Sequence, residues 1–166
     1  MEQKEIYLDF LSNVDKLRSG DRVALKRSAG VMLPDADGKA IAAFYRCSYT
    51  PLSKWQEEDR YFAVACIKCL WDPTEGEGKP FENILAELIA SQELSDSMEH
   101  RIEGLLDTAW DADGYLLTKF TRMMKLLRQK STQKPDFAAL LEDLLYWNCD
   151  DQRVQRKWAR TIFSAR

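Results

Sequence analysis

Apolar residues recur at helical spacing along nearly the whole chain. In the N-terminal segment they stand at i, i+4, i+8 and i+11, which places them on one face of a helix. These positions are Ile6, Phe10, Val14 and Leu17. No run of alternating apolar and polar residues is long enough to predict a strand. The pattern therefore predicts an all-α protein, a compact bundle of eight or nine short helices.

Proline and glycine fall between the helical segments and set their boundaries. The predicted helices span residues 3–17, 21–29, 39–47, 53–71, 81–90, 95–109, 116–128, 137–149 and 151–164. Side-chain caps are expected from Ser53, from Asp111 or Asp113, and from Asp150. Helices this short are marginal alone, so packing must hold them together.

The length of 166 residues suits a single domain, 1–166. Residues 72–80 read DPTEGEGKP, which is rich in proline, glycine and acid and predicts a flexible linker. This linker leaves open a division into two helical lobes, 1–72 and 80–166, that share a core.

The segment 114–135 has six basic residues and no acid. At about 100° per residue its apolar and basic side chains separate onto opposite faces. The basic face holds Lys119, Arg122, Lys125 and Arg128, and the apolar sector holds Leu116, Leu117, Phe120, Met123, Met124, Leu126 and Leu127. A solvated surface is the simpler interpretation, but segregated positive charge favours a surface that faces a polyanion.

The net charge of -3 conceals this segregation. Residues 72–113 contain twelve acids against two bases, whereas the next segment is purely basic. Local potential steers a ligand more than the total charge does, so an acidic pI does not exclude nucleic acid.

The last predicted helix has a similar basic stripe. Its cations stand at i, i+3, i+4 and i+7, opposite the apolar residues Val154, Trp158 and Ile162. The stripe consists of Arg153, Arg156, Lys157 and Arg160. Two interpretations remain open: these cations bind an anion, or they only complement the helix dipole. The tryptophans Trp147 and Trp158 lie on apolar faces and are predicted to be core residues.

Four cysteines give no disulfide framework, which favours a reducing, cytoplasmic location. No apolar run approaches the roughly 20 residues of a membrane span, and the N-terminal residues lack the pattern of a secretory signal. We therefore expect a cytoplasmic protein with no membrane partner.

Motifs that could carry chemistry are weak. Cys66 and Cys69 form a C-x-x-C pair, but the other candidate ligands, Cys47, Cys149 and His100, do not stand at zinc-site spacing. Both cysteines fall in mid-helix, so we interpret them as small buried side chains. The two D-x-D-G sequences fail as calcium loops and are interpreted as turns and helix caps. No catalytic set, cofactor site or metal site is expected, and an enzyme is disfavoured.

The order of several short motifs resembles the CasB family, the small subunit of the type I-E CRISPR surveillance complex Cascade. An early basic segment, GDRVALKR, spans residues 20–27, and Arg101 precedes the paired leucines 105–106. The basic helix 116–128 follows. The sequence LLEDL at 140–144, then Trp147, then VQRKWAR at 154–160 complete the match.

This resemblance implies a non-catalytic subunit that holds the guide RNA–target heteroduplex and the displaced DNA strand through basic surfaces. It implies as partners the other Cascade subunits, guide RNA, target DNA and a second copy of the chain. The expected nucleic-acid-binding residues are Arg22, Lys26, Arg27, Arg101, Lys119, Arg122, Lys125, Arg128, Arg153, Arg156, Lys157 and Arg160. The alternative is a protein–protein scaffold whose basic faces touch no nucleic acid.

Overall fold

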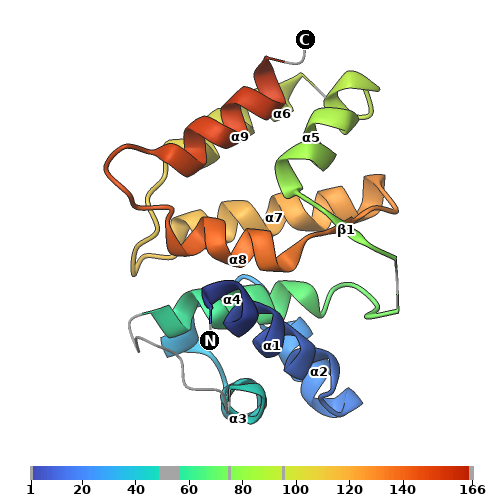
Figure 1. Ribbon diagram of the computed structural model, residues 1–166, viewed down its shortest axis with the longest axis vertical. Coiled ribbons are helices and arrows are strands. Elements are labelled where there is room, and N and C mark those ends of the chain that lie inside the picture. The colour runs from blue at the N-terminus through green and yellow to red at the C-terminus, as the bar shows by residue number, and fades with distance from the viewer. Residues whose placement is uncertain (1, 49–56, 75, 95, 165–166) are drawn as a thin grey trace.

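The computed structural model describes residues 2–48, 57–74, 76–94 and 96–164 (Figure 1). In these ranges it contains nine α-helices, one short 3-10 helix and two short strands, which confirms the all-α prediction. The elements are α1 (Gln3–Asp15), α2 (Ser19–Arg27), η1 (Leu33–Asp35), α3 (Gly38–Cys47), α4 (Glu58–Lys68), β1 (Gly78–Lys79), α5 (Phe81–Ala90), α6 (Ser97–Leu106), α7 (Tyr115–Lys130), β2 (Lys134–Pro135), α8 (Phe137–Leu145) and α9 (Arg153–Phe163). Within the described ranges, no helix combines the length and the apolar character needed to cross a membrane.

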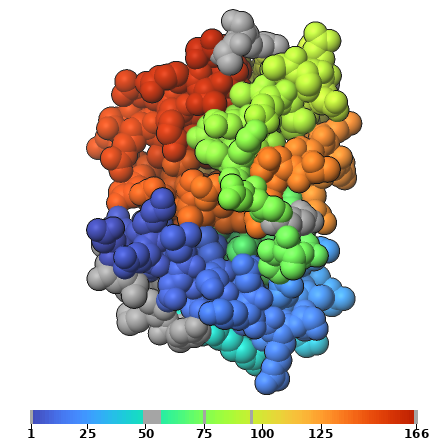
Figure 2. Space-filling model, turned by 45° about the vertical axis from the view of Figure 1, so that its right-hand side comes forward, coloured from blue at the N-terminus to red at the C-terminus, as the bar shows by residue number. Residues whose placement is uncertain are grey.

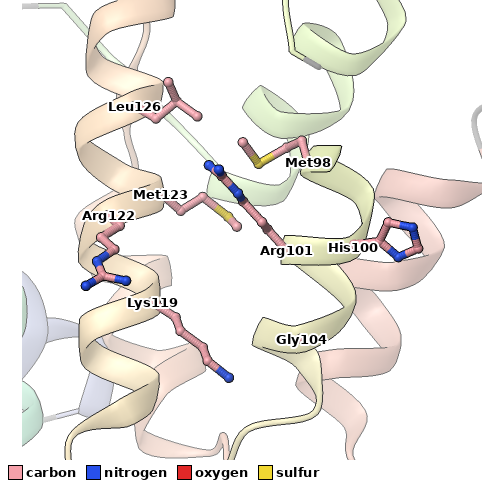
Figure 3. Close-up of a pocket in the computed structure, with 8 residues that line it drawn as sticks. All are labelled: Met98, His100, Arg101, Gly104, Lys119, Arg122, Met123 and Leu126. Atoms are coloured by element: carbon pink, nitrogen blue, oxygen red, sulfur yellow. The ribbon is translucent and has the colours of Figure 1, made fainter. Parts of the chain in front are cut away.

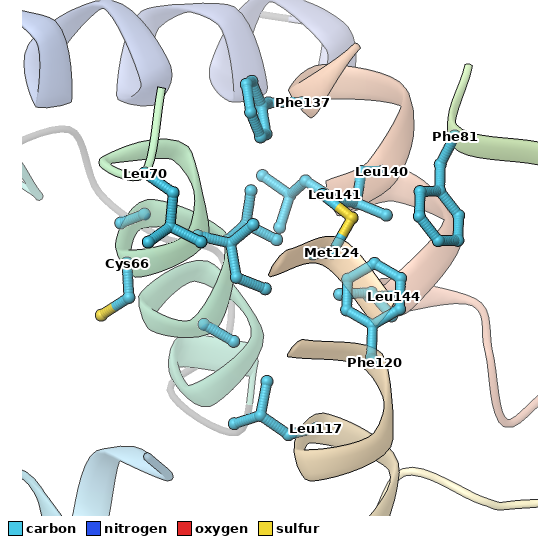
Figure 4. Close-up of a cluster of buried hydrophobic side chains, with 14 of the residues drawn as sticks. Cys66, Leu70, Phe81, Leu117, Phe120, Met124, Phe137, Leu140, Leu141 and Leu144 are labelled. Carbon is cyan, nitrogen blue, oxygen red and sulfur yellow. The ribbon is translucent and has the colours of Figure 1, made fainter. Parts of the chain in front are cut away.

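Helix α4 is deeply buried, because every one of its residues from 61 to 68 is buried, as are residues 69–71 directly after it. It packs against α2, η1, α7 and α8. Figure 4 shows Cys66 and Leu70 on one side of this contact and Leu117, Met124 and Leu141 on the other. The predicted start of this helix at Ser53 lies outside the described residues.

The N-terminal helices α1–α4 and the C-terminal helices α5–α9 occupy opposite halves of the molecule (Figures 1 and 2). The two halves meet where α4 packs on α7 and α8, and where α1 packs on α8. Buried apolar residues from both halves belong to one continuous cluster. Independent behaviour of the two halves as lobes stays a prediction.

An aromatic cluster holds α5, α7 and α9 together in the C-terminal half. Phe81, Phe120 and Trp158 lie with ring centroids 5.1–6.2 Å apart. Trp147 packs edge-on against Trp158 at 5.0 Å. Both tryptophans are at most 1% exposed, so their predicted place in the core is confirmed.

The end of the predicted linker is more ordered than its composition suggested. Strand β1 pairs in parallel with β2, and Asp136 donates its backbone N–H to the Lys79 carbonyl at 2.7 Å. A Cβ on Gly78 would lie 2.6 Å from the Pro135 carbonyl oxygen, so only glycine fits this approach. Residues 78 and 79 are therefore held by backbone pairing, and the flexibility of the 72–80 linker stays a prediction. The pairing joins segments more than fifty residues apart, which local composition cannot report.

Two predicted helix caps were also wrong. Helix α7 begins after Gly114, whose φ of 73° is left-handed, and no side chain caps it. The Asp111 carboxylate instead accepts from the Asp113 backbone in a turn. Helix α9 begins after Gln152 with no side-chain cap, so Asp150 does not cap it. The expected aspartate cap in the first D-x-D-G sequence is confirmed, because Asp37 accepts from the Ala40 N–H at 2.9 Å.

Candidate nucleic-acid interface

Helix α7 presents its cations to solvent, as the sequence pattern predicts. Lys119, Arg122, Lys125 and Arg128 are all exposed, whereas Leu126 in the apolar sector is half-buried. The remaining side chains of that apolar sector are at most 5% exposed: Leu116, Leu117, Phe120, Met123, Met124 and Leu127. Burial of one face therefore fixes the rotation of the helix and points the basic face outward.

A groove of about 430 Å³ runs between α6 and α7, and cations from both helices line it. Figure 3 shows Arg101 extending from α6 toward α7, and Lys119 extending from α7 toward α6. Arg122 lines the same groove from α7. Arg101 and the basic face of α7, both expected from the sequence to bind nucleic acid, thus border one groove.

Acidic side chains of the protein do not neutralise these cations. Among the described residues, Arg101, Arg122 and Lys125 have no carboxylate within 4.0 Å. Lys119 donates to the neutral hydroxyl of Thr108 at 2.9 Å, which orients its ammonium without neutralising it. A row of uncompensated cations attracts anions more strongly than one already paired with acids.

At the far end of α7, the guanidinium of Arg128 lies over the ring of Trp71, 5.6 Å from its centroid. The side chain of Arg22 on α2 lies close to Cys69, two residues before this tryptophan. The segment 69–72 therefore brings together one cation from α2 and one from α7. This neighbourhood places Arg22 near the far end of the α7 face.

The three α2 cations differ in how much charge they present. Lys26 and Arg27 are exposed, whereas Arg22 is half-buried and its Nε has no hydrogen-bond partner among the described residues. Burial raises the pKa of the Cys69 thiol to about 11, and the charge of Arg22 offsets part of that rise. Arg22 therefore serves the α2–α4 contact as well as the surface.

The α9 stripe is exposed, but two of its cations already have partners. Lys157 Nζ lies 2.6 Å from Asp143 Oδ1, and the guanidinium of Arg153 lies over the Tyr146 ring at 4.4 Å. Arg156 and Arg160 have no ion pair within the described residues. Since α7 and α9 both turn aromatic rings into the shared cluster, their basic faces point outward in different directions.

The buried acids are part of the packing between helices. Glu82 and Asp143 are 4% and 6% exposed, and both face the ammonium of Lys157. Burial raises the pKa of Glu82, and the neighbouring Asp143 carboxylate raises it further. Trp158 Nε1 donates to Asp143 Oδ2 at 2.8 Å, so this carboxylate is held on both oxygens. The cluster joins α5, α8 and α9.

The cysteines have the environment of structural thiols. Cys66 is fully buried and Cys69 is 8% exposed. Burial raises the pKa of both thiols, Cys66 well above its usual value. In the described part of the chain, no group of three or more histidine, cysteine or acidic residues is placed to hold a metal ion.

The groove itself was not foreseen from the sequence. Its floor includes Met98 and Met123, and the helical pattern identified Met123 only as a position in the apolar sector. Gly104 also lines it, and a Cβ there would meet nothing within 4 Å. A glycine inside a predicted helix was the one local signal of an opening at this place.

Residues 21–163 match the family model described as CRISPR-associated protein Cse2. The chain belongs to the Cse2 family. The family resemblance drawn from the short motifs is thereby confirmed. A CRISPR-associated protein Cse2 from Thermus thermophilus is 28% identical to this Cse2-family chain, over 99% of the chain and 92% of the relative.

Solved structures share the fold of this Cse2-family chain. CasB from Thermus thermophilus superposes with a TM-score of 0.76 and 26% identity, covering 99% of both chains. A chain from a structure described as a CRISPR RNA-guided surveillance complex gives 0.75 at 22% identity, covering 97% of this chain and 93% of that one. At that lower identity the likeness establishes the fold.

Proposed function

We propose that this chain is a non-catalytic subunit of an RNA-guided CRISPR surveillance complex that holds nucleic-acid backbone on its basic helix faces. Membership of the Cse2 family supports the CRISPR role. The fold shared with a chain of an RNA-guided surveillance complex supports a place within such an assembly. The partners are the other subunits, the guide RNA, the target DNA and a second copy of the chain.

The observation that carries the proposal is the outward face of α7 together with Arg101 across the groove. Phosphates repeat along a strand, so a row of cations can neutralise several of them and release their counterions. The exposed cations project from fixed helices, and none of them has an acidic partner among the described residues. Phosphate contacts position a strand without reading its sequence, which suits a complex in which base pairing supplies specificity.

Two further surfaces extend the proposal. Arg22 lies near Trp71 at the end of the α7 face, so we expect a strand that follows α7 to meet Arg22 there, with Lys26 and Arg27 on the same helix α2. The α9 stripe points in another direction and would meet a different strand or a different segment. Within that stripe Arg156 and Arg160 carry the charge that is not already paired, so they are the stronger candidates there.

The test is a salt series of target-DNA affinity in the assembled complex, with Arg122, Lys125 and Arg128 changed to alanine. Four to six phosphate contacts on a single strand predict a slope of log K against log salt of about -3 to -4. Loss of three contacts should make the slope shallower by about 2 and weaken binding at low salt. The guide RNA and the other subunits should still assemble with the variant.

A matched control changes three exposed lysines outside the α7 face to alanine. One lies in α1, one directly after α1 and one in α3. These are Lys4, Lys16 and Lys39, each exposed in the structure. The control changes net charge by the same amount but leaves the α7 face intact, so its slope should match the unmodified complex. Unchanged affinity and slope in the α7 variant would contradict the proposal and favour the protein–protein scaffold.

A further inference from the structure

The groove between α6 and α7 combines an apolar floor with a cationic rim. Met98 and Met123 are 2% and 5% exposed and turn toward each other across it, and half-buried Leu126 extends the floor (Figure 3). Arg101 extends from α6 across the groove toward α7, and Lys119 extends from α7 toward α6. No carboxylate belongs to the lining among the described residues.

We infer that this groove takes one unstacked nucleobase of a single strand, while the rim cations hold the adjoining phosphates. The inference rests on the proposed nucleic-acid role of this face and specifies how the strand is held. A phosphate gains nothing from an apolar floor, so the rim alone would account for backbone binding. A nucleobase has a flat, apolar face, and methionine sulfur makes favourable contacts with such rings.

The size and shape of the groove fit this occupant. Ligand pockets typically enclose roughly 300–1,000 Å³, and this groove of about 430 Å³ falls within that range. Gly104 keeps the α6 wall open, because a Cβ there would meet nothing within 4 Å. A base inside a duplex is stacked and paired, so only a base of a single strand can turn into the groove. The methionine floor offers no directed hydrogen bonds, and the His100 side chain, which also lines the groove, is 86% exposed, so the site should show little preference between bases.

The first test compares two short strands that have equal numbers of phosphates, using the full-length chain. One strand is oligo-dT, and the other has the same backbone with abasic sugars. Anisotropy titrations at several salt concentrations should show the abasic strand binding about three- to tenfold more weakly with the same salt slope. Equal affinity for the two strands would overturn the base site.

The second test fills the groove without changing any charge. Gly104→Leu places a side chain in the open space, and Gly104→Ala is the matched smaller change. Gly104→Leu should reduce oligo-dT affinity to that for the abasic strand and leave abasic binding unchanged, and Gly104→Ala should have an intermediate effect. A melting curve confirms that each variant is folded. A folded Gly104→Leu protein that still prefers oligo-dT would contradict the inference.

Methionine methyl NMR on the unmodified chain provides a readout that does not depend on any variant. Oligo-dT should shift the methyl signals of Met98 and Met123 through ring currents, and the abasic strand should not. Met124 is the internal control, since it is fully buried in the core. Absence of these shifts at saturation overturns the base site. Shifts that appear on assembly with the other subunits, before nucleic acid is added, would assign the groove to a protein partner and also overturn it.

The experiments distinguish failure of the base site from failure of the phosphate contacts on α7. If the base site fails while the Arg122, Lys125 and Arg128 variant still weakens binding, the strand is held by its phosphates alone. If that variant also has no effect, the nucleic-acid role of α7 fails as well.

Discussion

Trp158 donates its indole N–H to Asp143 Oδ2 at 2.8 Å, inside the contact between α8 and α9. The other oxygen of the same carboxylate receives the ammonium of Lys157 at 2.6 Å. A carboxylate that is 6% exposed needs such partners, because an unpaired buried charge is costly. The hydrogen bond therefore fixes α9 on α8, and with it the direction of the α9 stripe.

Changing Trp158 to phenylalanine removes this bond and leaves one carboxylate oxygen without its donor. We expect the free energy of unfolding to fall by about 2–4 kcal/mol, from the lost charged hydrogen bond and the lost ring volume. Trp147→Phe is the matched control, because its indole donates to the neutral Thr108 carbonyl at 2.8 Å. Urea denaturation should rank Trp158→Phe as the more destabilising change, and the reverse order would contradict the role given to Asp143.

Glu82 should make stability depend on pH with a definite sign. Its pKa is raised by burial and by the neighbouring Asp143 and Asp136, and Lys157 offsets only part of that rise. The folded state therefore binds the Glu82 proton more tightly than the unfolded state does. This contribution to stability is fully present below the unfolded pKa of about 4.3 and is lost as pH rises through the folded pKa.

Glu82→Gln is uncharged at every pH and tests this sign. We expect the variant to be more stable than the unmodified chain at neutral pH, because it removes a buried carboxylate that disfavours ionisation. The advantage should shrink as pH falls toward about 4, where the unmodified side chain becomes protonated. Thermal melts of both proteins at matched pH values measure the difference. An advantage that stays constant, or grows toward acid pH, would show that the Lys157 pairing outweighs burial.

Cys66 and Cys69 are expected to act through packing alone. Replacing both with alanine should lower the free energy of unfolding by about 1 kcal/mol, since two buried sulfur atoms are lost. The raised pKa of each thiol keeps it protonated at neutral pH, so alkylation of the folded chain should be slow. Chelators should leave the melting temperature unchanged. Stoichiometric zinc in the purified protein would overturn this interpretation.

Gly114, directly before α7, should be sensitive to substitution. Its φ is 73°, and a Cβ would lie 3.0 Å from Met32 Cγ. Gly114→Ala should destabilise the chain by about 1–2 kcal/mol, because a left-handed residue with a Cβ is strained. Gly104→Ala is the control, since that position is helical and open, and it should stabilise by up to about 1 kcal/mol. The two substitutions should shift the denaturation midpoint in opposite directions. Shifts in the same direction would be inconsistent with this account.

The α9 stripe is expected to contribute less to nucleic-acid binding than α7. Changing Arg156 and Arg160 to alanine removes the two cations without ion pairs among the described residues of the stripe. In the assembled complex the salt slope should become shallower by at most about 1.5, the value for two single-strand contacts. A slope change larger than that of the α7 variant would make α9 the principal contact surface. No change would leave α9 with the helix-dipole role alone.

The sequence by itself determined the helices and the division of α7 into two faces. Both depend on periodicity within a single helix, where side chains three and four residues apart lie together whatever surrounds them. The family was also within reach of the sequence, because short motifs keep their order along the chain. Trp147 and Trp158 were assigned to the core on the same local grounds.

Tertiary structure decided everything that joins distant segments. The α6–α7 groove, the placement of Arg128 over Trp71 and the pairing of β1 with β2 each need two parts of the chain to meet. Their distances depend on packing that no local pattern encodes. The expected caps of α7 and α9 are absent because a left-handed residue, Gly114 or Gln152, occupies the N-cap position of each helix. Local periodicity thus set which side chains face outward, and packing set which of those side chains became neighbours.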